Sequence, residues 1–184
     1  EIVFVDYGSD DFYKNALSEL LTEYQNVKYI YSYHKDQPWS RAKALNIGIK
    51  QVDTEFVFMS DIDMIFRYDF IEKLYLLKSD KMSVCFRVGF LDEEESKQDK
   101  VFESYKIKHL SGVGAEGLSL FSTSALKEIQ GFDEFFHFWG AEDEDIHNRL
   151  LNKGLQKHFY QEEVLMLHQW HVSYRRSEST KLAK

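Results

Sequence analysis

The sequence predicts an α/β domain in which helices flank a mostly parallel sheet. Short apolar segments typical of buried strands alternate with segments whose apolar residues recur at helical spacing. Strands that alternate with helices are typical of βαβ units with right-handed crossovers. The chain has 184 residues, which is enough for one substantial core. We therefore expect a single domain over residues 1–176, followed by a polar tail over residues 177–184.

The elements predicted for the first third of the chain end at a pair of aspartates. In order, they are a strand over 1–5, a helix over 12–24, a strand over 27–31, a helix over 40–51 and a strand over 56–60. Ser40 is expected to cap the second helix, because a serine hydroxyl can accept from the free N–H groups of a helix start. The last of these strands stops at Asp61 and Asp63. Ligands of open α/β sheets gather at such carboxyl ends, so these two carboxylates are candidates for chemistry.

The rest of the chain continues the alternation. The predicted elements are a helix over 70–77, a strand over 83–87, an exposed loop over 91–108, a short helix over 124–129, a helix over 142–153 and a strand over 164–167. The acidic run from Asp92 to Glu95 indicates a solvated loop. Gly154 is expected to end the 142–153 helix, since glycine is favoured just past a helix C-terminus.

Composition and charge exclude several classes of protein. The net charge is −8, from 23 basic and 31 acidic residues, which argues against general nucleic-acid binding. No apolar stretch is long enough to span a bilayer, so we expect no membrane span. The single cysteine, Cys85, lies in an apolar run and is expected to be a buried, inert thiol in a reducing compartment.

Two acidic clusters are the candidate chemical groups. Asp61 and Asp63 offer hard oxygen ligands at a strand end, which suit Mn²⁺ or Mg²⁺ bridging a diphosphate. The second cluster runs from Glu142 to Asp145 at a predicted helix start. Its carboxylates could also simply complement the helix dipole, a contribution of about 0.3–1 kcal/mol each. Asp61 could likewise cap a turn.

Three sequence blocks resemble a known family. They are Trp-Ser-Arg-Ala-Lys-Ala-Leu-Asn-Ile-Gly at 39–48, the Asp-Ile-Asp triplet at 61–63, and the segment from Gly-Phe-Asp to Trp-Gly-Ala-Glu-Asp-Glu-Asp over 131–145. In this order they resemble nucleotide-sugar glycosyltransferases of the GT-A fold, both the family 2 enzymes and the beta-1,4-galactosyltransferase family (family 7). The resemblance covers residues 1–171. It implies a Rossmann-like GT-A domain that uses a UDP-sugar donor, a carbohydrate acceptor and Mn²⁺ or Mg²⁺.

The resemblance also implies roles for matching residues. Implied donor-binding residues are Asp6 at the uridine, Arg41 near the uracil and phosphates, Asn46 in the same helix, Asp61 on the ribose side, and Gly117 in a loop that lets a sugar approach the backbone. Trp139 would lie at the donor and acceptor sugars, and Glu142 would bind sugar hydroxyls. Asp143 would be the catalytic base, and Asp63 the direct metal ligand.

The remaining metal ligands depart from the family pattern. The galactosyltransferase family completes its site with a methionine and a histidine three residues later, but here Met166 is followed at that spacing by Gln169. A frame shifted by two residues gives His168 and His171, which keep the spacing. Either histidine is a candidate ligand, and both together are allowed. The family also begins with a further strand, so we expect this chain to lack the family's first strand.

The chemistry favours inversion at the sugar. A metal on Asp63 would take up charge on the departing diphosphate, while Asp143 removes the proton of the attacking hydroxyl. The expected donor sugars are galactose, N-acetylgalactosamine or N-acetylglucosamine, for polysaccharide or glycan synthesis in a bacterial cytoplasm.

One alternative is a sugar nucleotidyltransferase, although no Gly-rich phosphate loop with a basic residue is visible. The other is a non-catalytic nucleotide- or carbohydrate-binding domain.

Overall fold

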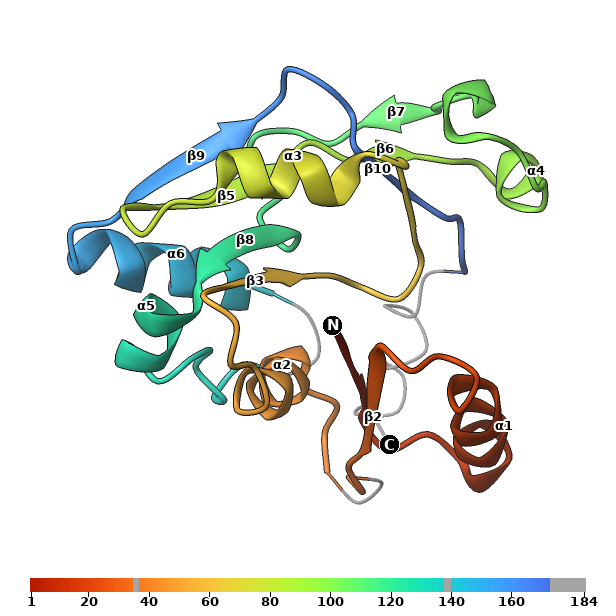
Figure 1. The fold of residues 1–184 in the computed structure, drawn as a ribbon, viewed down its shortest axis with the longest axis horizontal. Helices are drawn as coiled ribbons and strands as arrows, with labels where there is room; N and C mark the ends of the chain where they lie inside the picture. Colours follow the sequence, from red (N-terminus) through yellow and green to blue (C-terminus); the bar gives the residue numbers. More distant parts are fainter. Residues whose placement is uncertain (35–36, 138–139, 173–184) are drawn as a thin grey trace, which may run out of the picture.

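The computed structural model describes residues 1–34, 37–137 and 140–172. Within them, three small β-sheets are surrounded by helices (Figure 1). The strand orders are β1-β2, β3-β8-β5-β9 and β4-β10-β6-β7. No helix in these residues is both long and apolar enough to cross a membrane. The predicted tail over 177–184 lies outside the described residues.

The first sheet holds the N-terminal part of the chain. Strands β1 (Ile2–Asp6) and β2 (Val27–Tyr31) pair in parallel, with Ile2 opposite Val27. Parallel neighbours need a crossover, which is supplied by α1 (Asp11–Leu21). Helix α2 (Arg41–Ile49) packs closely on β1, because a Cβ at Gly48 would lie 3.4 Å from a methyl carbon of Val5. As predicted, Ser40 caps α2 and accepts a hydrogen bond from the Lys43 N–H at 3.3 Å.

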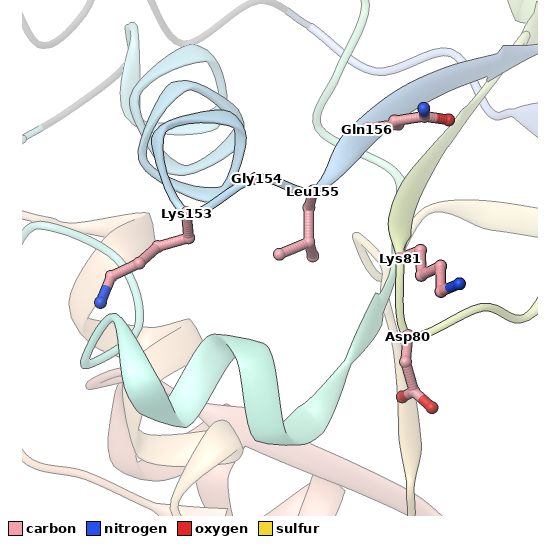
Figure 2. A pocket seen from close by; sticks show the side chains of 6 residues that line it. All are labelled: Asp80, Lys81, Lys153, Gly154, Leu155 and Gln156. Carbon is pink, nitrogen blue, oxygen red and sulfur yellow. The ribbon is translucent and has the colours of Figure 1, made fainter.

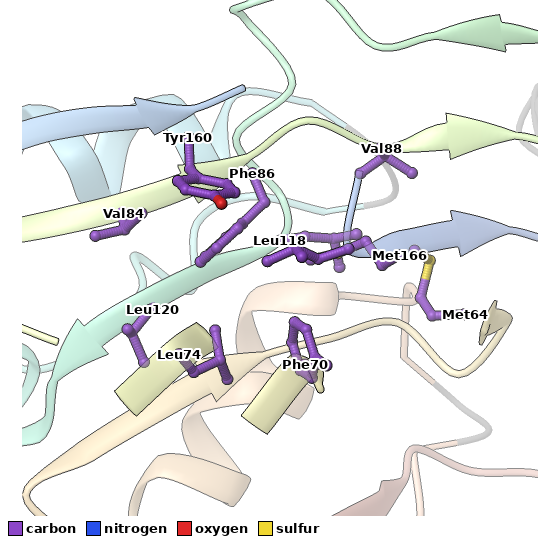
Figure 3. Close-up of a cluster of buried hydrophobic side chains, with 11 residues drawn as sticks. Met64, Phe70, Leu74, Val84, Phe86, Val88, Leu118, Leu120, Tyr160 and Met166 are labelled. Carbon is purple, nitrogen blue, oxygen red and sulfur yellow. The ribbon is translucent and has the colours of Figure 1, made fainter. Parts of the chain in front are cut away.

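The second sheet separates two hydrophobic cores. Its strands are β3 (Phe56–Met59), β8 (Ser119–Ser122), β5 (Met82–Phe86) and β9 (Gln156–Tyr160). On one face, α3 (Phe70–Leu77) buries Phe70 and Leu74 against Val84, Phe86 and Leu120 (Figure 3). On the other, α5 (Thr123–Glu128) and α6 (Glu142–Asn152) bury Leu126, Ile146 and Leu150 against Phe121. Leu120 faces one core and the next residue, Phe121, faces the other, as expected for a strand buried on both faces.

The third sheet brings the end of the described chain next to the aspartate pair. Strand β10 (Met166–His168) runs antiparallel to β4 (Met64–Phe66) and parallel to β6 (Gly89–Phe90). Strand β7 (His109–Leu110) pairs with β6. In the β10–β4 register, His168 lies opposite Met64, the residue after Asp63.

Two expectations are not met. The sheets are mixed rather than mostly parallel, because β8 runs antiparallel to both β3 and β5. The segment 91–108 is not a plain exposed loop: it contains α4 (Glu93–Ser96) and the 3₁₀ helix η1 (Phe102–Ser104), and it leads into β7 at His109. Glu95 is buried there, because its carboxylate accepts from Lys100 Nζ at 2.8 Å and from the Lys106 N–H at 3.1 Å.

Other predicted features agree with the structure. Helix α3 spans the predicted range, and α6 ends within a residue of its predicted C-terminus. Gly154 follows that end with φ +91°, a backbone conformation that favours glycine. Cys85 is buried and unpaired, and burial raises the pKa of its thiol to about 11, so it stays protonated.

Candidate active site

Arg41 joins three segments that are far apart in the sequence. It is the first residue of α2, and each nitrogen of its guanidinium donates a hydrogen bond to another part of the chain. Nε donates to Asp61 Oδ1 at 2.9 Å, Nη1 to Asp143 Oδ1 at 2.7 Å, and Nη2 to the Gly117 carbonyl at 2.8 Å. The planar fork of arginine suits such simultaneous contacts. Burial alone would lower the pKa of Arg41, but the carboxylates of Asp61 and Asp143 raise it, so the group stays charged.

The side chain of Asp143 has a raised pKa. It is the second residue of α6 and is partly buried. Burial raises its pKa to about 6; the Arg41 guanidinium opposes this shift, and the carboxylates of Glu142 and Asp61 add to it. A base is most effective when its pKa lies near the working pH, and ordinary aspartates titrate about two units lower. The environment therefore tunes this carboxyl group toward neutral pH.

Gly117 fits tightly beside Asp143. A Cβ at this position would lie 3.1 Å from Asp143 Oδ2, so a larger residue would push the carboxylate away. The carbonyl of Gly117 accepts from Arg41. Gly117 therefore lets both the carboxylate and the guanidinium approach the backbone closely.

The turn before α6 holds Glu142 in place. Glu142 is buried, accepts from the Gly140 N–H at 3.2 Å, and its Oε1 lies 3.9 Å from Arg41 Nη1. Ala141 adopts a left-handed conformation with φ +57°. Such a conformation costs a non-glycine residue on the order of 1–3 kcal/mol and is found preferentially at functional sites. Trp139, predicted to contact the sugars, lies outside the described residues.

Asp63, His168 and His171 form a cluster that could hold a metal ion. Asp63 Oδ2 lies 3.3 Å from His168 Nε2 and 3.2 Å from His171 Nε2, and the three ligand atoms lie within 4.8 Å of one another. The Gln169 N–H donates to the Asp63 carbonyl at 2.9 Å, which fixes the chain between the two histidines. Both candidate histidines thus reach the same carboxylate.

One atom of this cluster points to a ligand. Asp63 Oδ1 is buried and has no hydrogen-bond partner among the described residues. A buried carboxylate oxygen without a partner is costly, so such atoms usually face an ion or an ordered water. One carboxylate and two imidazoles are also a donor set that suits divalent ions such as Mn²⁺. The residues present therefore fit the predicted metal.

Sequence comparisons point to glycosyltransferases. The family described as the N-terminal domain of galactosyltransferase matches residues 98–171, a range that includes Gly117, Asp143 and both histidines. Mouse Beta-1,4-galactosyltransferase 1 is 29% identical over 131 residues, covering 69% of this chain and 29% of that protein. Mouse Chondroitin sulfate synthase 3 is 26% identical over 153 residues, covering 72% of this chain and 16% of that protein. The chain therefore spans less than a third of the length of these relatives.

Solved structures share the fold. A structure of GalNAc-T7 with UDP, GalNAc and Mn²⁺ matches with a TM-score of 0.66 at 15% identity, covering 94% of this chain and 38% of that one. The chain has the GT-A glycosyltransferase fold. Staphylococcus aureus TarS with UDP-GlcNAc gives a TM-score of 0.65 at 17% identity, covering 96% and 51%. A Drosophila beta-1,4-galactosyltransferase 7 mutant with manganese, UDP-Gal and xylobiose gives 0.55 at 17% identity, covering 95% and 72%. The predicted resemblance to GT-A glycosyltransferases is confirmed.

Two predicted donor-binding residues of the GT-A domain are already engaged within the protein. Asp6 is buried at the end of β1, where it accepts from the Ser9 N–H at 2.9 Å and from the Tyr29 hydroxyl at 2.8 Å. Asn46 is buried on α2, where it exchanges two hydrogen bonds with the Phe132 backbone, at 2.8 and 2.9 Å. Asn46 therefore anchors the segment that leads to α6. Direct contacts of Asp6 and Asn46 with a nucleotide stay predictions.

A stacked pair of rings next to Asp6 was not predicted from the sequence. Tyr7 stacks on His34 with ring centroids 4.1 Å apart and an angle of 14° between the planes. The Tyr7 hydroxyl and His34 Nδ1 are buried, and each lacks a hydrogen-bond partner among the described residues. Nothing in the spacing of Tyr7 and His34 marks them as a pair, because the stacking arises only from the pairing of β1 with β2.

A separate pocket lies away from these residues. It has a volume of about 270 Å³ and is lined by six residues (Figure 2): Asp80, Lys81, Lys153, Gly154, Leu155 and Gln156. These lie at the C-terminal end of α6 and the starting ends of β5 and β9. Asp143 lies at the opposite end of α6, so this pocket is not part of the candidate active site.

Proposed function

We propose that this GT-A domain transfers a sugar from a UDP-sugar to a carbohydrate hydroxyl with inversion, using Mn²⁺ or Mg²⁺. The observation that carries the proposal is the connection between the metal cluster and the base. Asp61 lies two residues before Asp63 and is bonded to Arg41, which is bonded to Asp143. Arg41 therefore links the aspartate pair that includes the candidate metal ligand to the candidate base.

The metal-binding role falls to Asp63, His168 and His171. A divalent ion bound there would neutralise the charge that develops on the departing diphosphate. The positive guanidinium of Arg41 would add to that stabilisation, since it is buried and keeps its charge. The donor is a UDP-sugar by analogy with the structural neighbours, whose complexes hold UDP with GalNAc, UDP-Gal or UDP-GlcNAc.

Asp143 is assigned the proton transfer. Its carboxylate accepts the proton of the acceptor hydroxyl as the hydroxyl oxygen bonds to the anomeric carbon and the bond to the diphosphate breaks. Attack from the side opposite the leaving group inverts the anomeric centre. Arg41 keeps the carboxylate oriented and ionised at neutral pH, because it opposes the burial that raises the pKa. The donor sugar is expected to be galactose, N-acetylgalactosamine or N-acetylglucosamine.

The first experiment is calorimetric titration of UDP with and without Mn²⁺ on the wild type, Asp63→Ala and the control Asp53→Ala. Asp53 is an exposed aspartate outside the site. Binding that needs Mn²⁺ and is lost only in Asp63→Ala supports the proposed donor site. Equal UDP binding in all three proteins contradicts it. Release of UDP from UDP-galactose, UDP-N-acetylgalactosamine and UDP-N-acetylglucosamine then identifies the donor, and binding without any turnover favours a non-catalytic domain.

A further inference from the structure

A buried polar cluster lies directly behind the proposed base. Its centre is His147, which is fully buried and follows Asp143 by four residues on α6, so the two lie on one face of the helix. His147 Nδ1 lies 2.9 Å from Ser83 Oγ on β5, and Nε2 lies 3.1 Å from Ser119 Oγ on β8. Cys85 Sγ, also on β5, lies 3.3 Å from Nε2. One helix side chain is thus bonded to two neighbouring strands.

The hydrogen bonds assign the tautomer of this histidine. Ser119 Oγ donates its proton to the Glu116 carbonyl at 2.8 Å, so it can only accept from His147, and Nε2 carries the proton. Nδ1 is then the acceptor for the Ser83 hydroxyl. A neutral imidazole has one donor and one acceptor, and both are used. Burial lowers the pKa of His147 to about 4, with Glu116 and Lys157 as the charged neighbours, so this neutral state holds at physiological pH.

The same cluster reaches the segment that holds Arg41. Ser119 is bonded to Glu116, whose side chain pairs with Lys157 on β9 at 2.6 Å. Gly117, the next residue, supplies the carbonyl that accepts from Arg41. His147 therefore connects α6 to the start of β8, just after Gly117. Two of the three hydrogen-bond partners of Arg41, Asp143 and Gly117, therefore lie on or next to α6 and β8, the elements that His147 joins.

The start of α6 lacks a side-chain cap. Its N-cap residue is Ala141, which has no side chain to cap the helix and lies in a left-handed conformation. Serine, threonine, aspartate or asparagine would normally satisfy the free N–H groups there. A Cβ added at Gly117 would lie 3.1 Å from Asp143 Oδ2, so the glycine leaves room for the carboxylate beside its backbone. A fully satisfied buried polar network fixes one arrangement, whereas apolar packing alone tolerates sliding.

We propose that His147 is a positioning residue that sets the rotation of α6, and thereby holds Asp143 between Arg41 and Gly117. The importance of Asp143 rests on the proposed function. The NMR test of the contact between Arg41 and Asp143 does not. It predicts that the Arg41–Asp143 contact loosens when the hydrogen bonds of His147 are removed, even if the helix still packs.

The test compares four variants of the full chain. His147→Phe removes the hydrogen bonds to Ser83 and Ser119 but keeps a ring. In the wild type the centroid of the imidazole lies 5.2 Å from that of Phe121, so the new ring can still pack there. His147→Gln retains one amide that can reach a serine, and Ser83→Ala removes only one bond. Leu74→Ala is the matched control, because it creates a cavity in the core on the opposite face of the sheet.

The readout is nitrogen-15 NMR of the Arg41 guanidinium, assigned by its loss in Arg41→Lys. In the wild type, the contacts to Asp143 and Gly117 should restrict rotation and keep separate Nη signals. We expect these signals to merge in His147→Phe, to broaden in His147→Gln and Ser83→Ala, and to stay separate in Leu74→Ala. Separate signals in His147→Phe, or merged signals in the Leu74→Ala control as well, would overturn the proposal. If His147→Phe does not fold, the other two variants decide.

Turnover gives an independent measure. A displacement of the base by about 1 Å can cost about 10²-fold in rate, so kcat should fall by about tenfold to a hundredfold in His147→Phe. Mn²⁺ binding should not change, since Asp63 lies just before β4, His168 lies on β10 and His171 follows it. An equal loss of Mn²⁺ affinity would contradict a role limited to the Arg41–Asp143 contact. A wild type without turnover would refute the proposed function and leave the NMR test of His147 intact.

Discussion

Arg41 and Asp143 form an ion pair of 2.7 Å between residues that are 102 positions apart in the chain. The pair joins the first turn of α2 to the first turn of α6. Each residue changes the acid–base properties of the other: the carboxylate helps raise the pKa of Arg41, and the guanidinium limits the rise in the pKa of Asp143. The base of the proposed reaction is therefore set by two helices rather than by a local motif.

Asp143→Asn should lower sugar transfer strongly while sparing donor binding. General-base catalysis contributes about 10²–10⁴-fold, so kcat should fall within that range. The asparagine keeps the size of the side chain, and its carbonyl oxygen can still accept from Arg41. UDP release and calorimetry measure the two effects separately. Asp53→Asn, at an exposed position, serves as the control and should keep full activity. Retained turnover in Asp143→Asn would refute the assignment of the base.

The pH dependence of the reaction should report the state of Asp143. The base must be ionised, so kcat/KM should rise with pH and level off above a pKa of about 6. Arg41→Met removes the positive charge that lowers this pKa, and the acidic limb should then move to higher pH. Rate profiles of both proteins over the range in which each stays folded test this. An acidic limb that moves to lower pH, or does not move, would contradict the proposed coupling.

Local signals in the sequence were sufficient for the ends of several elements. Ser40 and Gly154 mark the ends of α2 and α6 because caps depend only on nearby residues. The resemblance to GT-A glycosyltransferases made Asp63, His168 and His171 candidate metal ligands, and the pairing of β10 with β4 brings them together.

Features that depend on distant pairing were not predictable in this way. The antiparallel direction of β8 is set by its neighbours β3 and β5, and the edge strand β9 (Gln156–Tyr160) is too polar to stand out. The burial of Glu95 depends on Lys100 and the Lys106 N–H. Ser83 and Cys85 share one face of β5, a signal for a polar cluster, but only the folded chain supplies His147.

Removal of the metal should abolish UDP binding. Each histidine should make its own contribution to binding Mn²⁺. Each of Asp63→Ala, His168→Ala and His171→Ala removes one candidate ligand of the cluster. Mn²⁺ at 100 times its Kd should stabilise the wild type by about 2.7 kcal/mol, because it binds only the folded state. Thermal unfolding with Mn²⁺ or EDTA measures this effect. His158→Ala is the control, since His158 lies on β9, outside the cluster. A Mn²⁺ stabilisation that persists in Asp63→Ala would place the ion elsewhere.

Asn46→Ala should destabilise the fold more than it affects the chemistry directly. The substitution leaves the Phe132 N–H and carbonyl buried without their partner, at a cost of about 1–3 kcal/mol for an unsatisfied group. The midpoint of urea unfolding should fall accordingly, with an unchanged slope. Asn152→Ala, at the exposed last residue of α6, is the matched control and should change stability little. If Asn46 instead acts mainly by binding the donor, the variant will lose UDP affinity while its unfolding midpoint stays at the wild-type value.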